Sequence, residues 1–144
     1  MQYDGYIPEG LKVSVPNCGI VAVAIATKRT IAEVTERASK SFNLPASWRG
    51  ITTGFQRDHL MFQFGYELKP SVICNVWLQT VVKRLNPEVM YMIRTGGSRR
   101  GHVMIVHKGF VIDQGGPKPV ETHWNRRGRV TSVHIVKSMH TDSI

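Results

Sequence analysis

The pattern of hydrophobic and polar residues divides the chain into a helical first half and a strand-rich second half. Residues 19–26 are apolar on all sides, which is typical of a buried helix, although their β-branched members would also fit a buried strand. Behind a capping box that begins at Thr30, the residues Ile31, Val34 and Ala38 recur on one helix face. Two further helices are predicted over residues 55–64 and 76–85, the second one capped by Asn75.

The hydrophobic period changes after Pro87, where short runs of β-branched and aromatic residues alternate with turn residues. A short extended segment is predicted over residues 66–72, and strands over residues 89–94, 103–107, 110–113, 120–124 and 130–136. Helices followed by strands predict the α+β class, with a helical half packed on an antiparallel sheet. The 144 residues suffice for one domain, which we take to span residues 1–144.

Residues 101–114 are the most informative segment, because a two-residue turn of Lys108 and Gly109 predicts a β-hairpin. This turn sets a register that pairs His107 with Phe110, Ile105 with Ile112 and Met104 with Asp113. His102 and Asp113 should then share a face as diagonal neighbours, about 7–8 Å apart at Cα. Such a carboxylate can hold an imidazole in one tautomer and stabilise its charged form. The alternative interpretation is a polar end of the sheet with an exposed His102.

Cys18 is predicted to open the first helix, directly after a capping residue, Asn17. The positive end of the helix dipole lowers the pKa of a thiol there and favours the thiolate, which is the form needed for nucleophilic attack. Gly19 would let a substrate carbonyl approach the backbone, and the Cys18 N–H could donate to the developing oxyanion. The alternative interpretation is a small buried core residue, which is how we interpret Cys74.

The positive charge of the chain limits the classes of partner that we expect it to bind. The net charge is +9, with basic clusters at Arg99 and Arg100 and at Arg126, Arg127 and Arg129. Such a surface can be merely solvated, or it can attract an acidic partner, an anionic wall polymer or nucleic acid. No nucleic-acid-binding motif accompanies the charge, so we expect a peptide or protein substrate and rank nucleic acid below it.

No metal, cofactor or membrane partner is expected. Two cysteines and six scattered histidines lack the paired spacing of a zinc site. We interpret His59, His123, His134 and His140 as surface or structural residues. The apolar run at residues 19–26 is too short to span a bilayer, and the first residues lack the pattern of a secretory signal. We therefore expect a cytoplasmic location, with delivery inside a virion as the alternative.

Taken together, the order Cys, His, Asp resembles that of papain-like cysteine peptidases. It is most similar to the double-glycine-type peptidases that mature bacteriocins and to their stand-alone relatives. Those domains carry a Cys-Gly-x-x-Ala-x-Ala helix start, here residues 18–24, and a Gly-His-apolar strand followed by an Asp, here residues 101–106 and Asp113. The resemblance implies a papain-like fold and a thiol-dependent hydrolase that cleaves peptide or isopeptide bonds. It implies Cys18 as nucleophile, His102 as base and Asp113 as the carboxylate that orients the base.

One feature of those families is absent. A Gln about six residues before the cysteine usually donates to the oxyanion, whereas this chain has Lys12 there, so Asn17 or Lys12 would have to take that role. Gly19, Gly101 and Arg100 are the residues that we expect to contact substrate.

Two alternative functions stay open. One is a CHAP-like peptidoglycan amidase, which uses the same Cys–His chemistry. The other is a papain-like binding module of weak or no activity with a basic surface for a protein or nucleic-acid partner, which the missing Gln favours. The small size would suit a bacteriophage or accessory bacterial protein.

Overall fold

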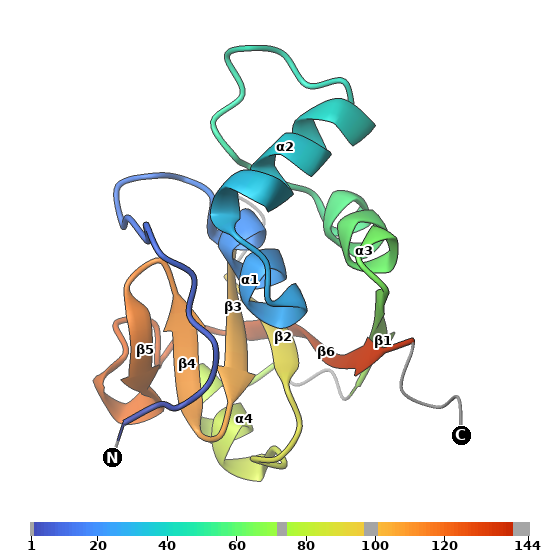
Figure 1. Cartoon of the computed structure of the whole chain (residues 1–144). Helices are drawn as coiled ribbons and strands as arrows, with labels where there is room; N and C mark the ends of the chain where they lie inside the picture. Colours follow the sequence, from blue (N-terminus) through green and yellow to red (C-terminus); the bar gives the residue numbers. More distant parts are fainter. Residues whose placement is uncertain (1, 72–74, 97–100, 140–144) are drawn as a thin grey trace.

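An antiparallel sheet of six strands, in the order β1-β6-β2-β3-β4-β5, forms the centre of the computed structural model, which describes residues 2–71, 75–96 and 101–139 (Figure 1). The strands are β1 (Tyr66–Pro70), β2 (Tyr91–Thr95), β3 (His102–His107), β4 (Phe110–Asp113), β5 (Gly116–Pro119) and β6 (Val130–Ser138). The helices are α1 (Cys18–Thr27), α2 (Ile31–Ser41), α3 (Gly54–Gln63), α4 (Leu78–Arg84) and the short 3₁₀ helix η1 (Val120–Thr122). The predicted α+β class is confirmed.

Each face of the sheet carries its own hydrophobic cluster. On one face α1 packs on β3 and also contacts α2 and α3, so the helix is enclosed by the sheet on one side and by helices on the other (Figure 1). This position explains why residues 19–27 are all buried and why the helix needs no polar face. On the opposite face α4 packs its Leu78 and Val81 into a second cluster with Ile93 and Met104. None of the helices in the described residues is long and apolar enough to cross a membrane.

Side chains fix the starts of the helices around α1. The predicted cap at Thr30 is confirmed, since its hydroxyl accepts the backbone N–H of Glu33 at 3.0 Å. A capping box with both hydrogen bonds joins Thr53 and Gln56, and α3 begins one residue earlier than predicted. Asn17 occupies the capping position before α1, but its side chain makes no capping hydrogen bond.

The start predicted for the fourth helix is wrong. Instead of beginning behind Asn75, α4 begins at Leu78. The preceding residues pair with the segment that leads into β6: the carbonyl of Val76 accepts the N–H of Val130 at 2.9 Å, and Trp77 forms an isolated β-bridge. Pairing with a distant segment therefore outweighs the local tendency to form a helix at these two positions.

The strand predicted over residues 120–124 is also wrong, because this stretch begins with η1. The strand lies just before it, in β5, where Pro117 and Pro119 pair with β4. Proline has no N–H to donate, so it is tolerated in a strand with one neighbour. As the edge of the sheet, β5 is such a strand. Here the proline residues mislead the pattern-based prediction.

The hairpin of β3 and β4 has the predicted register, with Ile105 opposite Ile112 and His107 opposite Phe110. Lys108 and Gly109 both have positive φ, 55° and 80°, as a type I′ turn requires. His102 is the first residue of β3 and Asp113 is the last residue of β4. The hairpin thus brings both to the same end of the sheet, which is also the end that the first residue of α1 reaches.

Candidate active site

Cys18 lies at the N-terminus of α1, half-buried, with its sulfur against the start of β3. The His102 ring and the backbone N–H of Val103 lie close enough to the thiol for hydrogen bonding from both to lower its pKa. The His102 ring nitrogen Nε2 is engaged by Asp113, which leaves Nδ1 to face the sulfur. The structure therefore brings the predicted nucleophile, base and carboxylate together in one continuous row.

These contacts shift the pKa of both reactive groups. Burial alone would raise the pKa of the Cys18 thiol, but the hydrogen bonds from His102 and Val103, with the nearby charges of His102 and Arg57, lower it below its ordinary value. Burial would lower the pKa of His102, but hydrogen bonds to Asp113 and Cys18 outweigh burial and raise it to about 9. Both shifts favour the ion pair of a thiolate and an imidazolium over the neutral pair.

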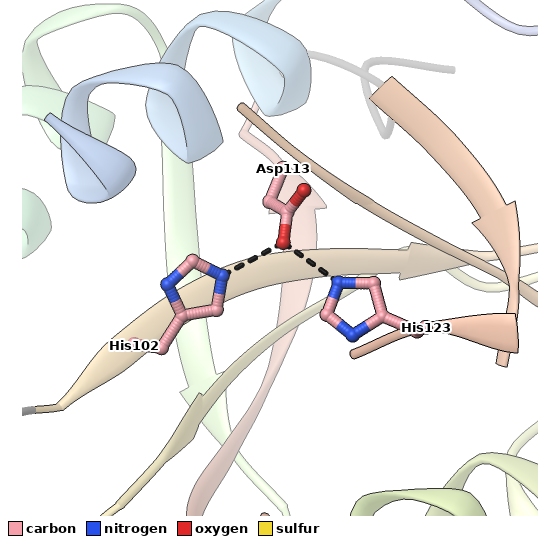
Figure 2. Close-up of side chains that lie close together, drawn as sticks. All are labelled: His102, Asp113 and His123. Carbon is pink, nitrogen blue, oxygen red and sulfur yellow. Dashed lines mark hydrogen bonds and ion pairs between the residues drawn. The ribbon is translucent and has the colours of Figure 1, made fainter. Parts of the chain in front are cut away.

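Asp113 is the centre of a buried hydrogen-bond network (Figure 2). Its Oδ2 accepts from Nε2 of His102 at 2.8 Å and from Nε2 of His123 at 2.7 Å, while its Oδ1 accepts the N–H of Gly115 at 2.9 Å. Burial would raise the pKa of this carboxyl, but the three hydrogen bonds hold the pKa well below its usual range. Asp113 is thus ionised at neutral pH and holds the His102 ring in place.

His123 is the member of this network that the sequence did not reveal. It is fully buried, and its Nδ1 accepts the backbone N–H of Asn125 at 3.0 Å. The ring proton must then be on Nε2, which donates to Asp113. From the sequence, we expect His123 to be a surface or structural residue. It is not on the surface, and its hydrogen bond to Asp113 links it to the candidate active site. No motif marks His123, because it reaches Asp113 only through the fold of β5 and η1.

The cluster of His102, Asp113 and His123 also has the donor atoms of a metal site, with ligand atoms within 4.8 Å of one another. A metal on Nε2 of His123 would require the proton to sit on Nδ1. That nitrogen faces the N–H of Asn125 and accepts from it, so a proton there would oppose another donor. The hydrogen bonds therefore favour a proton-holding network over a metal centre.

A cleft of about 780 Å³ opens over Cys18 and His102. It is lined by Pro16, Gly19, Gly50, Ile51, Thr52, Arg57, Arg94, Thr95, Gly96, Gly101, Val103, Gln114, Trp124 and Asn125. Two of the predicted substrate contacts, Gly19 and Gly101, are among them, and Arg100 lies outside the described residues. Trp124 is exposed, with its ring centred 5.0 Å from His102 and 5.6 Å from His123. The indole thus contacts both imidazoles, a contact that the sequence did not suggest.

Neither residue expected to donate to an oxyanion lines the cleft. Lys12 is exposed outside it. Asn17 is covered by the buried Gly50, where an added Cβ would come within 2.6 Å of the Asn17 Cβ, and the Asn17 Oδ1 is buried with no hydrogen-bond partner. The structure therefore gives no support to either residue as an oxyanion donor.

Gln114 is better placed for that role. Its side chain lines the cleft, and its Nε2 donates to the carbonyl of Val15 at 2.9 Å, three residues before Cys18. An amide group has two protons, so a second one remains for a substrate oxygen. The N–H of Cys18, in the first turn of α1, has no partner within the helix. Together these two N–H groups form a candidate oxyanion hole that combines the helix start with the residue after Asp113.

Replacing Gln114 with alanine is expected to slow acylation of Cys18 by p-nitrophenyl acetate about a hundredfold, because one donor to the oxyanion is lost. Alkylation of the same thiol by iodoacetamide forms no oxyanion and serves as the internal reference. The ratio of the two rates separates loss of the oxyanion donor from a general change in the thiolate. Lys12→Ala is the matched control and should leave this ratio unchanged; a drop with Lys12→Ala and none with Gln114→Ala would reverse the assignment.

Stability should also depend on the proton held by His102. Its folded pKa, about 9, is above the unfolded value of 6.5, so its contribution is complete below 6.5 and is lost as the pH rises through 9. We expect the free energy of unfolding, measured by urea titration, to fall across this window. His102→Gln should flatten the decline, and an equally steep decline in that variant would contradict the assignment.

No family model matches this chain, and no match was found among the curated proteins or the solved structures compared with it. The geometry of the site itself therefore has to support any functional conclusion.

Proposed function

We propose that this chain is a thiol-dependent hydrolase, a papain-like cysteine peptidase that cleaves peptide or isopeptide bonds. The observation that carries the proposal is that Cys18 and His102 line one cleft and shift the pKa of one another, while Asp113 is hydrogen-bonded to His102 behind them. A nucleophile at a helix start, with its base on the first strand of an antiparallel hairpin, supports the papain-like assignment. Nucleophile, base and orienting group in hydrogen-bond contact are the elements that covalent acyl transfer requires.

The proposed reaction begins with attack of the Cys18 thiolate on the carbonyl carbon of the scissile bond. The carbonyl oxygen becomes an oxyanion that accepts from the Cys18 N–H and from Gln114. When the tetrahedral intermediate collapses, the C–N bond breaks and Nδ1 of His102 gives its proton to the departing amine, leaving a thioester.

Water completes the cycle. The neutral His102 takes a proton from water, which attacks the thioester carbonyl, and the acid product leaves as the thiolate and imidazolium form again. Throughout the cycle Asp113 remains ionised and keeps His102 in the reactive orientation, while His123 and Gly115 hold Asp113.

The proposal is tested by incubating the purified chain with a mixture of peptides and identifying new termini by mass spectrometry. New termini that disappear after treatment with iodoacetamide, with the adduct mapped to Cys18, are the expected result. Absence of cleavage combined with release of soluble fragments from purified peptidoglycan would instead assign the amidase function. If neither substrate reacts and Cys18 resists alkylation, the binding-module interpretation replaces both.

A further inference from the structure

Two arginines from different elements line the cleft together with the reactive pair. Arg57 comes from α3 and Arg94 from β2, and both line the cleft together with Cys18 and His102. A second cavity of about 400 Å³ is also lined by both arginines, so they lie between the cleft and this cavity. Both cations are thus placed where they can contact a molecule bound in the cleft.

Arg57 is held in place beside the nucleophile. Its Nη1 donates to the carbonyl and to the hydroxyl of Thr52, at 3.0 and 3.1 Å. Its side chain passes Gly19 so closely that a Cβ added there would lie 3.1 Å from the Arg57 Cδ and would overlap the Thr52 hydroxyl. Because these hydrogen bonds use only Nη1, the other N–H groups of the planar guanidinium remain available to donate to a ligand.

Arg94 lies beside the base in the same manner. A side chain at Gly101, the residue before His102, would overlap the Arg94 guanidinium. The hydrogen bond from Nη1 of Arg94 to the Thr131 hydroxyl is long, at 3.3 Å. Arg57 therefore lies beside Cys18 and Arg94 beside His102. The absence of a side chain at Gly19 and at Gly101 leaves room for them.

Neither guanidinium forms a salt bridge with a carboxylate in the described parts of the chain. Among the residues that the structure describes, no Asp or Glu lines the cleft, and the nearby Asp58 lines the second cavity only. Burial lowers the pKa of Arg57 and the charge of Arg94 lowers it further, although the Cys18 thiolate and Asp58 oppose both effects. Two half-buried like charges without a salt-bridged carboxylate among the described residues repel each other, and an anion bound between them would offset that repulsion.

We infer that the cleft selects substrates that carry a carboxylate next to the bond attacked by Cys18, with Arg57 and Arg94 as the groups that bind it. This inference deepens the proposed function and rests on it, since the carboxylate belongs to the molecule that Cys18 attacks. Arginine forks bind carboxylates through paired, charge-assisted hydrogen bonds, which makes them selective for this group. The substrate class is therefore an acidic peptide, with the carboxylate on a side chain or at the chain end.

The test compares two alkylating reagents that differ in charge, iodoacetate and iodoacetamide. Each transfers its carbon to the Cys18 sulfur and releases iodide, so the ratio of the rates, normalised to free cysteine, isolates the effect of the carboxylate. We expect a ratio well above one in the wild-type chain and a fall of about tenfold in Arg94→Gln, because a charge-assisted contact is lost. Arg94→Lys keeps the positive charge and should recover part of the preference.

A matched control removes an equal charge elsewhere. Arg84, exposed at the end of α4, lies outside the cleft, so Arg84→Gln should keep the wild-type ratio. A ratio unchanged in Arg94→Gln, or lowered equally in Arg84→Gln, would overturn the inference while rapid alkylation by iodoacetamide still supports the proposed function. Slow alkylation by both reagents would instead count against the proposed function itself.

Matched peptides then distinguish the two sources of the carboxylate. One pair differs by Glu or Gln beside the scissile bond, and the other by a free or amidated C-terminus. Selective cleavage of the acidic member of either pair, reduced in Arg94→Gln, supports the inference and identifies the source. Equal cleavage of both members in both pairs overturns it.

Discussion

A Cys18→Ala variant is expected to lose acylation by p-nitrophenyl acetate and to hydrolyse peptides about 10⁵–10⁶-fold more slowly than the wild-type chain, because the nucleophile is removed. The remaining groups could still bind substrate in the cleft, but no covalent intermediate can form without the sulfur. The substitution shortens a half-buried side chain by one atom, so the fold should be retained. Intact-mass measurement of the trapped acyl-enzyme and steady-state rates are the two readouts.

Cys74→Ala is the matched control, because it removes the other thiol of the chain. It should keep both the acyl-enzyme and the rate of hydrolysis. If Cys74→Ala abolished acylation and Cys18→Ala did not, the nucleophile would have been assigned to the wrong residue. A His102→Ala variant should retain slow alkylation of the thiol while losing hydrolysis, since the sulfur remains and the proton donor does not.

An Asp113→Asn variant should lose about 10³–10⁴-fold in the rate of acylation, because a neutral amide no longer holds His102 in its reactive tautomer. The asparagine amide can be placed in two orientations. With its oxygen at the position of Oδ2, its NH₂ lies at the position of Oδ1 and faces the N–H of Gly115. With its NH₂ at the position of Oδ2, the NH₂ faces the protonated Nε2 of both His102 and His123. The first orientation sets the NH₂ against one donor and the second sets it against two, and either one destabilises the buried network.

The pH profile of Asp113→Asn separates its effect on catalysis from general damage to the fold. In the wild-type chain the hydrogen bond to Asp113 helps to raise the pKa of His102 to about 9. Without the carboxylate, the pKa of His102 falls, and the high-pH limb of the acylation rate should move to lower pH. A His123→Gln variant keeps the charge on Asp113 and a side-chain donor, so we expect a smaller loss of about tenfold. An unchanged profile in Asp113→Asn would mean that Asp113 does not act on His102.

Much of the candidate site could be predicted from the sequence because its strongest signals are local. The two-residue turn of Lys108 and Gly109 sets the hairpin register, and the register places His102 and Asp113 on one face. The position of Cys18 at a helix start follows from the apolar run behind it. Each of these inferences needs only the geometry of one element or of two adjacent strands.

The remaining site residues come from segments that are far apart in the chain. Arg57 and Arg94 approach Cys18 and His102 from different elements, and Gln114 reaches the segment before α1 by a hydrogen bond to Val15. Such contacts depend on how α1 and α3 pack against the sheet, which no local pattern encodes. The incorrect strand at residues 120–124 had a different cause, the proline residues of β5, and it concealed the contact between His123 and Asp113.

The amino-acid sequence by itself thus determined the class of the fold, the buried first helix, the hairpin and the three residues that are candidates for covalent chemistry. Only the tertiary structure decided that the Cys18 sulfur meets the His102 ring, that His123 shares Asp113, and that two arginines without a carboxylate partner among the described residues lie in the cleft. The physical reason is one of range. Backbone periodicity and turn geometry act over a few residues, whereas the position of a side chain in a shared site depends on packing between elements that the chain brings together from a distance.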